Sequence, residues 1–253
     1  MHMRKFLISE LDPQAAELAR RYGLGVETTA FCAPENMEDD GEVARKAAAL
    51  AGFPVRSLHA PYYELTPCAI DPLIGRVSRR RYLQAAETCV QIGARRMVVH
   101  SGFQAQTYYP QWFVPKSIEF WRRFLDLLPE GVEIALENVF DPAPDLLGEI
   151  VDGVGDARFR ACLDLGHAFA YSAVPPEAWI DALGARISHV HLHNNAGECD
   201  VHAPLDCGGM DMQALLERLE TVAPEALLVI ESTDAQACLR YLLERGYIND
   251  QSV

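Results

Sequence analysis

Short apolar or β-branched runs alternate with longer stretches of helical periodicity along the whole chain, and this alternation constrains the fold more than any other feature. Helices are expected to begin where an N-cap acceptor precedes the apolar pattern, as at Asp12-Pro13, Asp71-Pro72 and Asp211. No Ser/Gly-rich linker or charge block divides the chain, so a single domain over residues 1–253 is predicted. The predicted strands are residues 5–9, 24–28, 55–59, 96–100, 132–137, 159–164, 187–193 and 226–231.

Eight strand and helix units in 253 residues match an α/β fold of the (β/α)₈ TIM-barrel type by number and by length. The alternative is an open, doubly wound sheet, for which a glycine-rich turn after an early strand would be expected, and none is evident. A barrel predicts that functional side chains lie at the C-terminal ends of its strands. Metal-competent side chains occupy that position in six strands: His59, His100, Glu137, Asp164, His191 and Glu231.

The densest group of such residues surrounds the seventh predicted strand. In the run His-Val-His-Leu-His at 189–193, the histidines alternate with apolar residues, so His189, His191 and His193 are expected to share one face of the strand. Asp200 and His202 follow shortly after. Imidazole and carboxylate are the usual nitrogen and oxygen ligands of catalytic divalent metals, so the pattern predicts a metal site.

Composition narrows the class of partner. The formal net charge of −14 repels polyanions, and the one basic cluster, Arg76 with residues 79–81, is predicted to be a solvated helix face. A nucleic-acid partner is therefore not expected. The seven cysteines never form a Cys-x-x-Cys pair, which favours free thiols in a reducing, cytoplasmic compartment, and no apolar run is long enough to span a membrane.

Seven short motifs occur in order from the third predicted strand to the eighth: LHAPY at 58–62, VHSG at 99–102, LEN at 136–138, LDLGHA at 163–168, VHLH at 190–193, DVH at 200–202 and IES at 230–232. Together they resemble the signatures of the xylose isomerase-like TIM-barrel superfamily. That superfamily contains metal-dependent sugar and sugar-phosphate isomerases and epimerases. It also contains the endonuclease IV group of abasic-site DNA repair enzymes, so the resemblance implies one fold and two functions.

The isomerase and epimerase branch implies one divalent ion (Zn, Mn, Mg or Co). The substrate would be a sugar, sugar phosphate or polyol-like metabolite that undergoes proton transfer next to a metal-bound carbonyl. Glu137 and Glu231 would supply the acid and base, and His167 would orient the substrate. No organic cofactor is expected. The implied metal ligands are Glu137, Asp164, His191 and Glu231.

The endonuclease IV branch implies a cluster of three zinc ions that attacks a phosphodiester. All nine positions of that pattern are filled here, and His193 is a further candidate ligand for metal or substrate. The net charge and a first strand without a Gly-Ala-His opening favour the small substrate and one ion over three. A barrel that binds metal and ligand without turnover is the third alternative. The nine positions are His59, His100, Glu137, Asp164, His167, His191, Asp200, His202 and Glu231.

Two further features qualify the resemblance. Asn194 stands where both branches usually carry aspartate, so a carboxylate that would orient a histidine is expected to be missing. The loop 103–113 is rich in aromatic residues and has four open roles: stacking on a sugar, closing the site, packing against a second subunit of a homo-oligomer, or packing on itself.

Overall fold

The computed structural model describes residues 5–249 of the protein, and the predicted domain limits at 1 and 253 lie outside these residues. The strands are β1 (Phe6–Ser9), β2 (Gly25–Thr28), β3 (Arg56–His59), β4 (Arg96–His100), β5 (Glu133–Glu137), β6 (Phe159–Asp164), β7 (Ile187–Leu192) and β8 (Leu227–Ile230). The α-helices are α1 (Ala15–Tyr22), α2 (Asp40–Leu50), α3 (Pro72–Ile92), α4 (Pro110–Leu125), α5 (Pro144–Val154), α6 (Leu165–Tyr171), α7 (Pro176–Leu183), α8 (Met212–Val222) and α9 (Ala235–Glu244). Short 3₁₀ turns, η2 (Pro34–Met37) and η3 (Gly184–Arg186), complete the elements.

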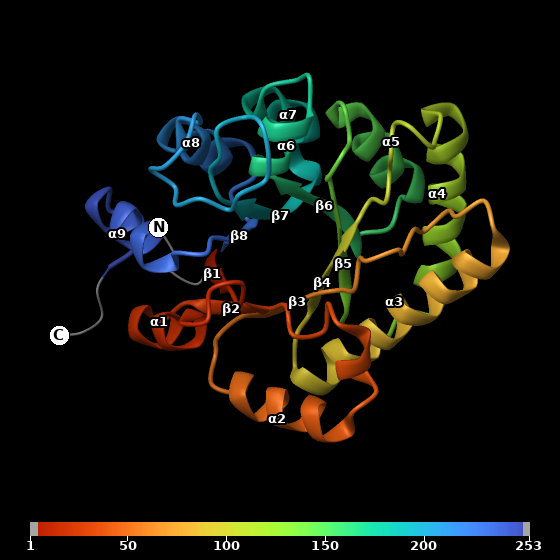
Figure 1. Ribbon diagram of the computed structural model, residues 1–253, viewed down its shortest axis with the longest axis horizontal. Helices are drawn as coiled ribbons and strands as arrows, with labels where there is room; N and C mark the ends of the chain where they lie inside the picture. The colour runs from red at the N-terminus through yellow and green to blue at the C-terminus, as the bar shows by residue number, and fades with distance from the viewer. Residues whose placement is uncertain (1–4, 250–253) are drawn as a thin grey trace.

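The strands close into one parallel barrel in sequence order, with β1 pairing to both β2 and β8. Helices surround this barrel (Figure 1), which confirms the predicted (β/α)₈ fold. Each observed strand lies within its predicted range and is shorter by at most two residues. The apolar runs therefore located the strands correctly, and only the ends differ.

Two of the three predicted helix starts are confirmed. Asp71 and Asp211 cap α3 and α8 by accepting hydrogen bonds from backbone N–H groups of the first turn. The start predicted at Asp12-Pro13 is wrong, because α1 begins only at Ala15. Asp12 instead accepts hydrogen bonds from the Gln14 N–H and, at 2.7 Å, from the Ala235 N–H, so it ties the first loop to the start of α9.

Alternation along each strand separates two apolar regions. In β4, Met97 and Val99 pack into the large core between strands and helices, whereas Val98 contacts Ala135 and Cys162 in a small separate cluster. Val98, Ala135 and Cys162 point into the barrel. The side chains two residues later in the same strands, His100, Glu137 and Asp164, therefore meet at its C-terminal mouth. Register supports this convergence, since His100 pairs with Glu137 and Asp164 with His191.

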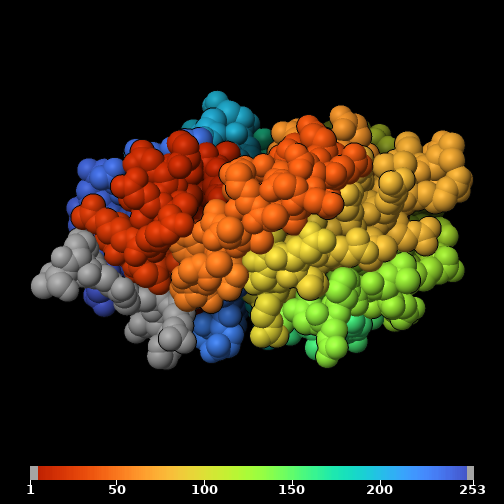
Figure 2. Space-filling model, turned by 90° about the horizontal axis from the view of Figure 1, so that it is seen from below, coloured from red at the N-terminus to blue at the C-terminus, as the bar shows by residue number. Residues whose placement is uncertain are grey.

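The outer surface is made by helices that follow one another around the barrel. Figure 2 shows the segments of α1, α2 and α3 side by side on one face.

None of the helices in residues 5–249 is both long and apolar enough to cross a membrane. All seven cysteines are free thiols, as predicted.

Candidate metal centre

The predicted site residues all meet at the C-terminal mouth of the barrel. Within the described residues, His, Cys, Asp and Glu ligand atoms form four groups whose members lie within 4.8 Å of one another. Three of these groups consist entirely of predicted residues: Glu137 with Asp164, His191 and Glu231; His59 with His100 and Glu137; and His193 with Asp200 and His202. The fourth, Cys162 with His189 and His191, begins two residues earlier along β6 and β7.

His191 lies at the centre of the first group, at the end of β7. Its Nδ1 atom is 3.0 Å from Glu137 Oε1, 3.0 Å from Glu231 Oε2 and 3.5 Å from Asp164 Oδ2. These side chains are almost completely buried, and the four come from four different strands or strand ends. Three carboxylates and one imidazole nitrogen therefore face a common point, which is a donor set suited to a divalent cation.

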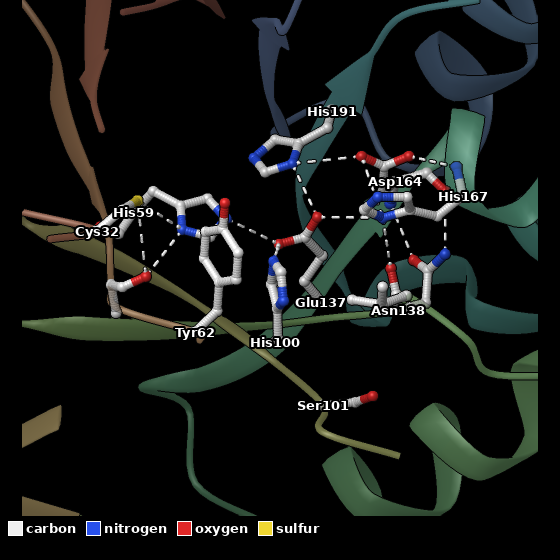
Figure 3. Close-up of polar contacts among 12 residues, drawn as sticks. Cys32, His59, Tyr62, His100, Ser101, Glu137, Asn138, Asp164, His167 and His191 are labelled. Carbon is white, nitrogen blue, oxygen red and sulfur yellow. Dashed lines mark hydrogen bonds and ion pairs between the residues drawn. The ribbon is translucent and has the colours of Figure 1, made fainter. Parts of the chain in front are cut away.

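Glu137 joins the first group to the second. Its Oε1 faces His191, while its Oε2 lies 3.3 Å from His59 Nε2 and 3.5 Å from His100 Nε2 (Figure 3). Tyr62 stacks on His100 with ring centroids 4.5 Å apart. One carboxylate thus serves both groups, with a separate oxygen directed toward each.

The third group stands beside the first and is linked to it by His167. Asp200 Oδ2 is 3.1 Å from His167 Nε2 and 3.0 Å from His202 Nε2, and His193 Nε2 is 3.0 Å from Asp164 Oδ1. His202 has a φ of 47°, a left-handed conformation that is costly outside glycine. From this backbone conformation the His202 imidazole faces Asp200.

Opposite charges stabilise each other throughout the site. Burial alone would raise the pKa values of Glu137 and Asp164, but the surrounding histidines hold both well below their usual range. Burial alone would lower the pKa of His191, yet Cys162 and the neighbouring carboxylates raise it well above its usual range. Burial alone would also lower the pKa of His202, but Asp200 raises it to about 9. The acidic groups therefore require positive charge between them.

The sequence reasoning missed Glu27, a fully buried carboxylate at the end of β2. Its Oε2 accepts a hydrogen bond from Ser57 at 2.8 Å and lies 2.9 Å from His189 Nε2, while its Oε1 is 3.0 Å from His191 Nε2. His189 and His191 thus both point into the barrel, as their alternation predicted. The available signal was the position of Glu27 at a strand end, which it shares with the predicted ligands.

A cavity of about 730 Å³ opens above these groups. Glu137, His167 and Glu231 reach it from the site, and its walls are mainly aromatic or neutral. Within the part of the chain that the structure describes, no lysine or arginine lines this cavity. The aromatic and apolar wall residues are Leu11, Tyr62, Tyr63, Leu65, Phe103, Tyr108, Val139, Phe140 and Tyr171.

The structure places both features that qualified the resemblance, Asn194 and the aromatic segment 103–113. The Asn194 amide donates to the carbonyls of Leu205 and Met210, so it holds the loop after β7 with a donor that aspartate lacks. The predicted loop 103–113 ends at Tyr109, because α4 begins at Pro110. The rings of Phe103 and Tyr108 pack against Phe113 in the first turn of α4, and both also line the cavity. These loop residues therefore pack on α4 and also form a wall of the site.

Comparison with known proteins agrees with this architecture. The family model described as "Xylose isomerase-like TIM barrel" matches residues 16–248. The protein MJ1311 of Methanocaldococcus jannaschii is 24% identical over 195 residues, which cover 72% of this chain and 66% of that protein. A probable endonuclease 4 of Mycobacterium leprae is 26% identical over 221 residues, covering 83% of this chain and 84% of the relative.

Solved structures have the same fold over nearly the whole chain. The TTHB071 protein of Thermus thermophilus, soaked with ZnCl₂, is 25% identical with a TM-score of 0.78, covering 95% of this chain and 97% of its own. A D-tagatose 3-epimerase-like protein is 20% identical with a TM-score of 0.80, covering 96% of each chain. At that identity the second likeness shows the fold alone.

The loop after β5 carries a buried acid whose ionisation we expect to affect stability. Burial raises the pKa of Asp141 to about 6, although Ser101 Oγ and Val139 N–H donate to it. In the unfolded chain the pKa is about 3.9, so the stabilising contribution is complete below pH ~4 and is lost as the pH rises through about 6.

Relative to the Asp141→Asn variant, we expect the wild-type free energy of unfolding to fall by about 2–3 kcal/mol between pH 4 and pH 7. Urea denaturation of both proteins across this pH range measures the difference. A difference that instead grows with pH would mean that the folded protein holds Asp141 ionised.

Proposed function

Because the chain belongs to the xylose isomerase-like TIM-barrel family, we propose that it is a metal-dependent isomerase or epimerase of a carbohydrate. The observation that carries this choice is the cavity above Glu137 and Glu231, which is lined by tyrosine and phenylalanine rings and has no lysine or arginine in its described lining. Aromatic faces suit a sugar ring, whereas a polyanion requires several cationic contacts. A neutral carbohydrate is therefore favoured over a sugar phosphate or DNA.

The residues present fit a divalent ion. We assign it to Glu137, Asp164, His191 and Glu231, because three buried carboxylates that converge on one imidazole nitrogen need a cation for charge balance. When bound there, the ion supplies Lewis acidity that polarises a substrate carbonyl.

Glu137 and Glu231 supply the acid and base in this proposal. Both line the cavity, and they reach the same nitrogen of His191 from β5 and from the end of β8. A substrate carbon held between them would lose its proton to one carboxylate and regain a proton from the other, or from the same one. His167, held by Asn138 O at 3.0 Å and by Asp200, would orient the substrate.

Glu27 acts in this scheme as a positioning residue. Glu27 faces Nε2 of His191 and favours a proton on that nitrogen. The other ring nitrogen, Nδ1, is then unprotonated and faces Glu137, Asp164 and Glu231. The chain thereby selects the ring orientation and the nitrogen that faces the cation.

We expect solvent deuterium to enter a carbon-bound position of the product when the substrate, found in a panel of ketoses, is converted in deuterated water. Glu231→Gln keeps the shape but removes the basic oxygen, so turnover should fall by about two to four orders of magnitude at equal metal content. Glu87→Gln, which changes an exposed carboxylate on α3 outside the cavity lining, is the matched control. A product without deuterium would leave the two glutamates as ligands only.

Glu27→Gln should weaken Zn²⁺ or Mn²⁺ binding about 10- to 100-fold, because the amide no longer holds the imidazole through a charged acceptor. Titration calorimetry on the metal-free protein measures this change, and thermal unfolding checks that the variant folds. Glu10→Gln is the control, since Glu10 instead pairs with Lys46 and Thr28. Unchanged affinity in Glu27→Gln would remove the positioning role.

A trinuclear phosphodiesterase is the second candidate, and the three convergent groups favour it specifically. Elemental analysis of the purified protein separates the two functions. We expect one divalent ion per chain. Three ions per chain, together with incision of a duplex that contains an abasic site and loss of incision in Glu137→Gln, would make the phosphodiesterase the correct function.

A further inference from the structure

A second cavity, of about 430 Å³, adjoins the main one on the side of α3. The two cavities share Cys32, Tyr63, Glu64 and Leu65 in their walls, so they adjoin each other at the mouth of the barrel. Figure 1 shows α3 starting at the outer edge of the molecule, beyond the loop that follows β3. The second cavity lies between this start of α3 and the loops after β2 and β3. We call it the side cavity.

The walls of the side cavity are apolar and open to solvent. Leu73, Ile74 and Val77 are 60%, 46% and 53% exposed and share one side of α3, at helical spacings of one and four residues. Tyr63, at the junction with the main cavity, is 61% exposed. Contiguous exposed apolar surface of this kind is typical of a binding site.

The side cavity offers no unpaired cation among its described lining residues. Arg81 is the one basic residue there, and its guanidinium lies 2.6 Å from Glu38 Oε1 and 2.9 Å from Gln84 Oε1. Glu64 adds a carboxylate. The ligand group that fits is therefore uncharged and apolar.

A line of aromatic rings connects the metal centre to the side cavity. Tyr62 stacks on His100, which faces Glu137, and Tyr63 lies 4.3 Å from Tyr62 between ring centroids. A sugar ring held over the metal centre would thus contact Tyr62, and a substituent on it would pass Tyr63 and Leu65 to reach α3. Pockets of roughly 300–1,000 Å³ bury drug-sized ligands. The two cavities together therefore have room for a sugar ring and a further group.

We propose that the side cavity is a subsite for an uncharged aryl or alkyl group carried by the carbohydrate substrate. This inference rests on the proposed function, and it narrows the substrate class to carbohydrates with an apolar substituent. Because the side cavity adjoins the main cavity along Tyr63 and Leu65, this occupant is favoured over a second copy of the chain.

The test compares equilibrium binding of O-methyl and O-phenyl ethers of the same ketose, substituted at a hydroxyl remote from the carbonyl, in fructo, psico and tagato series, to the metal-loaded protein by titration calorimetry. We expect the phenyl member of at least one pair to bind 10-fold or more tighter. Val77→Asp should abolish that difference, because it places a charge on the apolar wall. Val90→Asp is the matched control, since Val90 is equally exposed, at 53%, on another face of α3.

Equal affinities within every pair, or no binding by any phenyl ether, would overturn the subsite. A fall in mass on sedimentation with Val77→Asp and an unchanged phenyl preference would instead assign the α3 face to an interface between copies. Deuterium exchange into an unsubstituted ketose does not need the side cavity. Deuterium exchange without a phenyl preference would therefore contradict the subsite and leave the proposed function intact. A phenyl preference without deuterium exchange would contradict the proposed reaction and leave the subsite intact.

Discussion

Repulsion among buried carboxylates is the constraint on which the rest of the site depends. At an effective dielectric constant of 20, two like charges 4 Å apart repel by about 4 kcal/mol, so several acids cannot share one barrel mouth without positive charge between them. Protons on imidazoles or a divalent cation supply that charge. The histidines facing these acids are His59, His100, His167, His189, His191, His193 and His202, seven of the eight in the chain, and the eighth, His2, lies outside the described residues.

The barrel makes this concentration of charge possible because rigid strands hold each group before any ligand arrives. Close packing is part of that rigidity. A Cβ atom on Gly166 would lie 1.9 Å from Cε1 of His193, so the turn from β6 into α6 requires glycine to let the imidazole approach Asp164. Asn138 follows β5 directly and joins it to β6, because its side chain accepts a hydrogen bond from the Asp164 N–H and donates one to the Asp164 carbonyl.

The sequence predicted the barrel and the acidic and histidine side chains that converge at its mouth, because strand periodicity and strand-end position are local signals. It could not predict Glu27, whose partner His189 is 162 residues away and whose strand matches no motif of the resemblance. It also placed a helix cap at Asp12, because it could not foresee that the start of α9 would compete for that carboxylate. Cavities are equally non-local: the side cavity joins residues near 32, 63 and 77 that only the closed barrel brings together.

Glu137 belongs to two of the three convergent groups, so the two candidate functions share their central ligand and differ in how many groups a metal fills. The identity of the candidate ligands therefore cannot separate the two functions. The wall of the cavity can separate them, because a phosphodiester brings negative charge that needs cationic partners, whereas a neutral sugar needs flat faces. Tyr62 and Phe103 provide such faces beside Glu137. In both proposals, selectivity would reside in the loops after the strands, above candidate metal ligands that the two chemistries share.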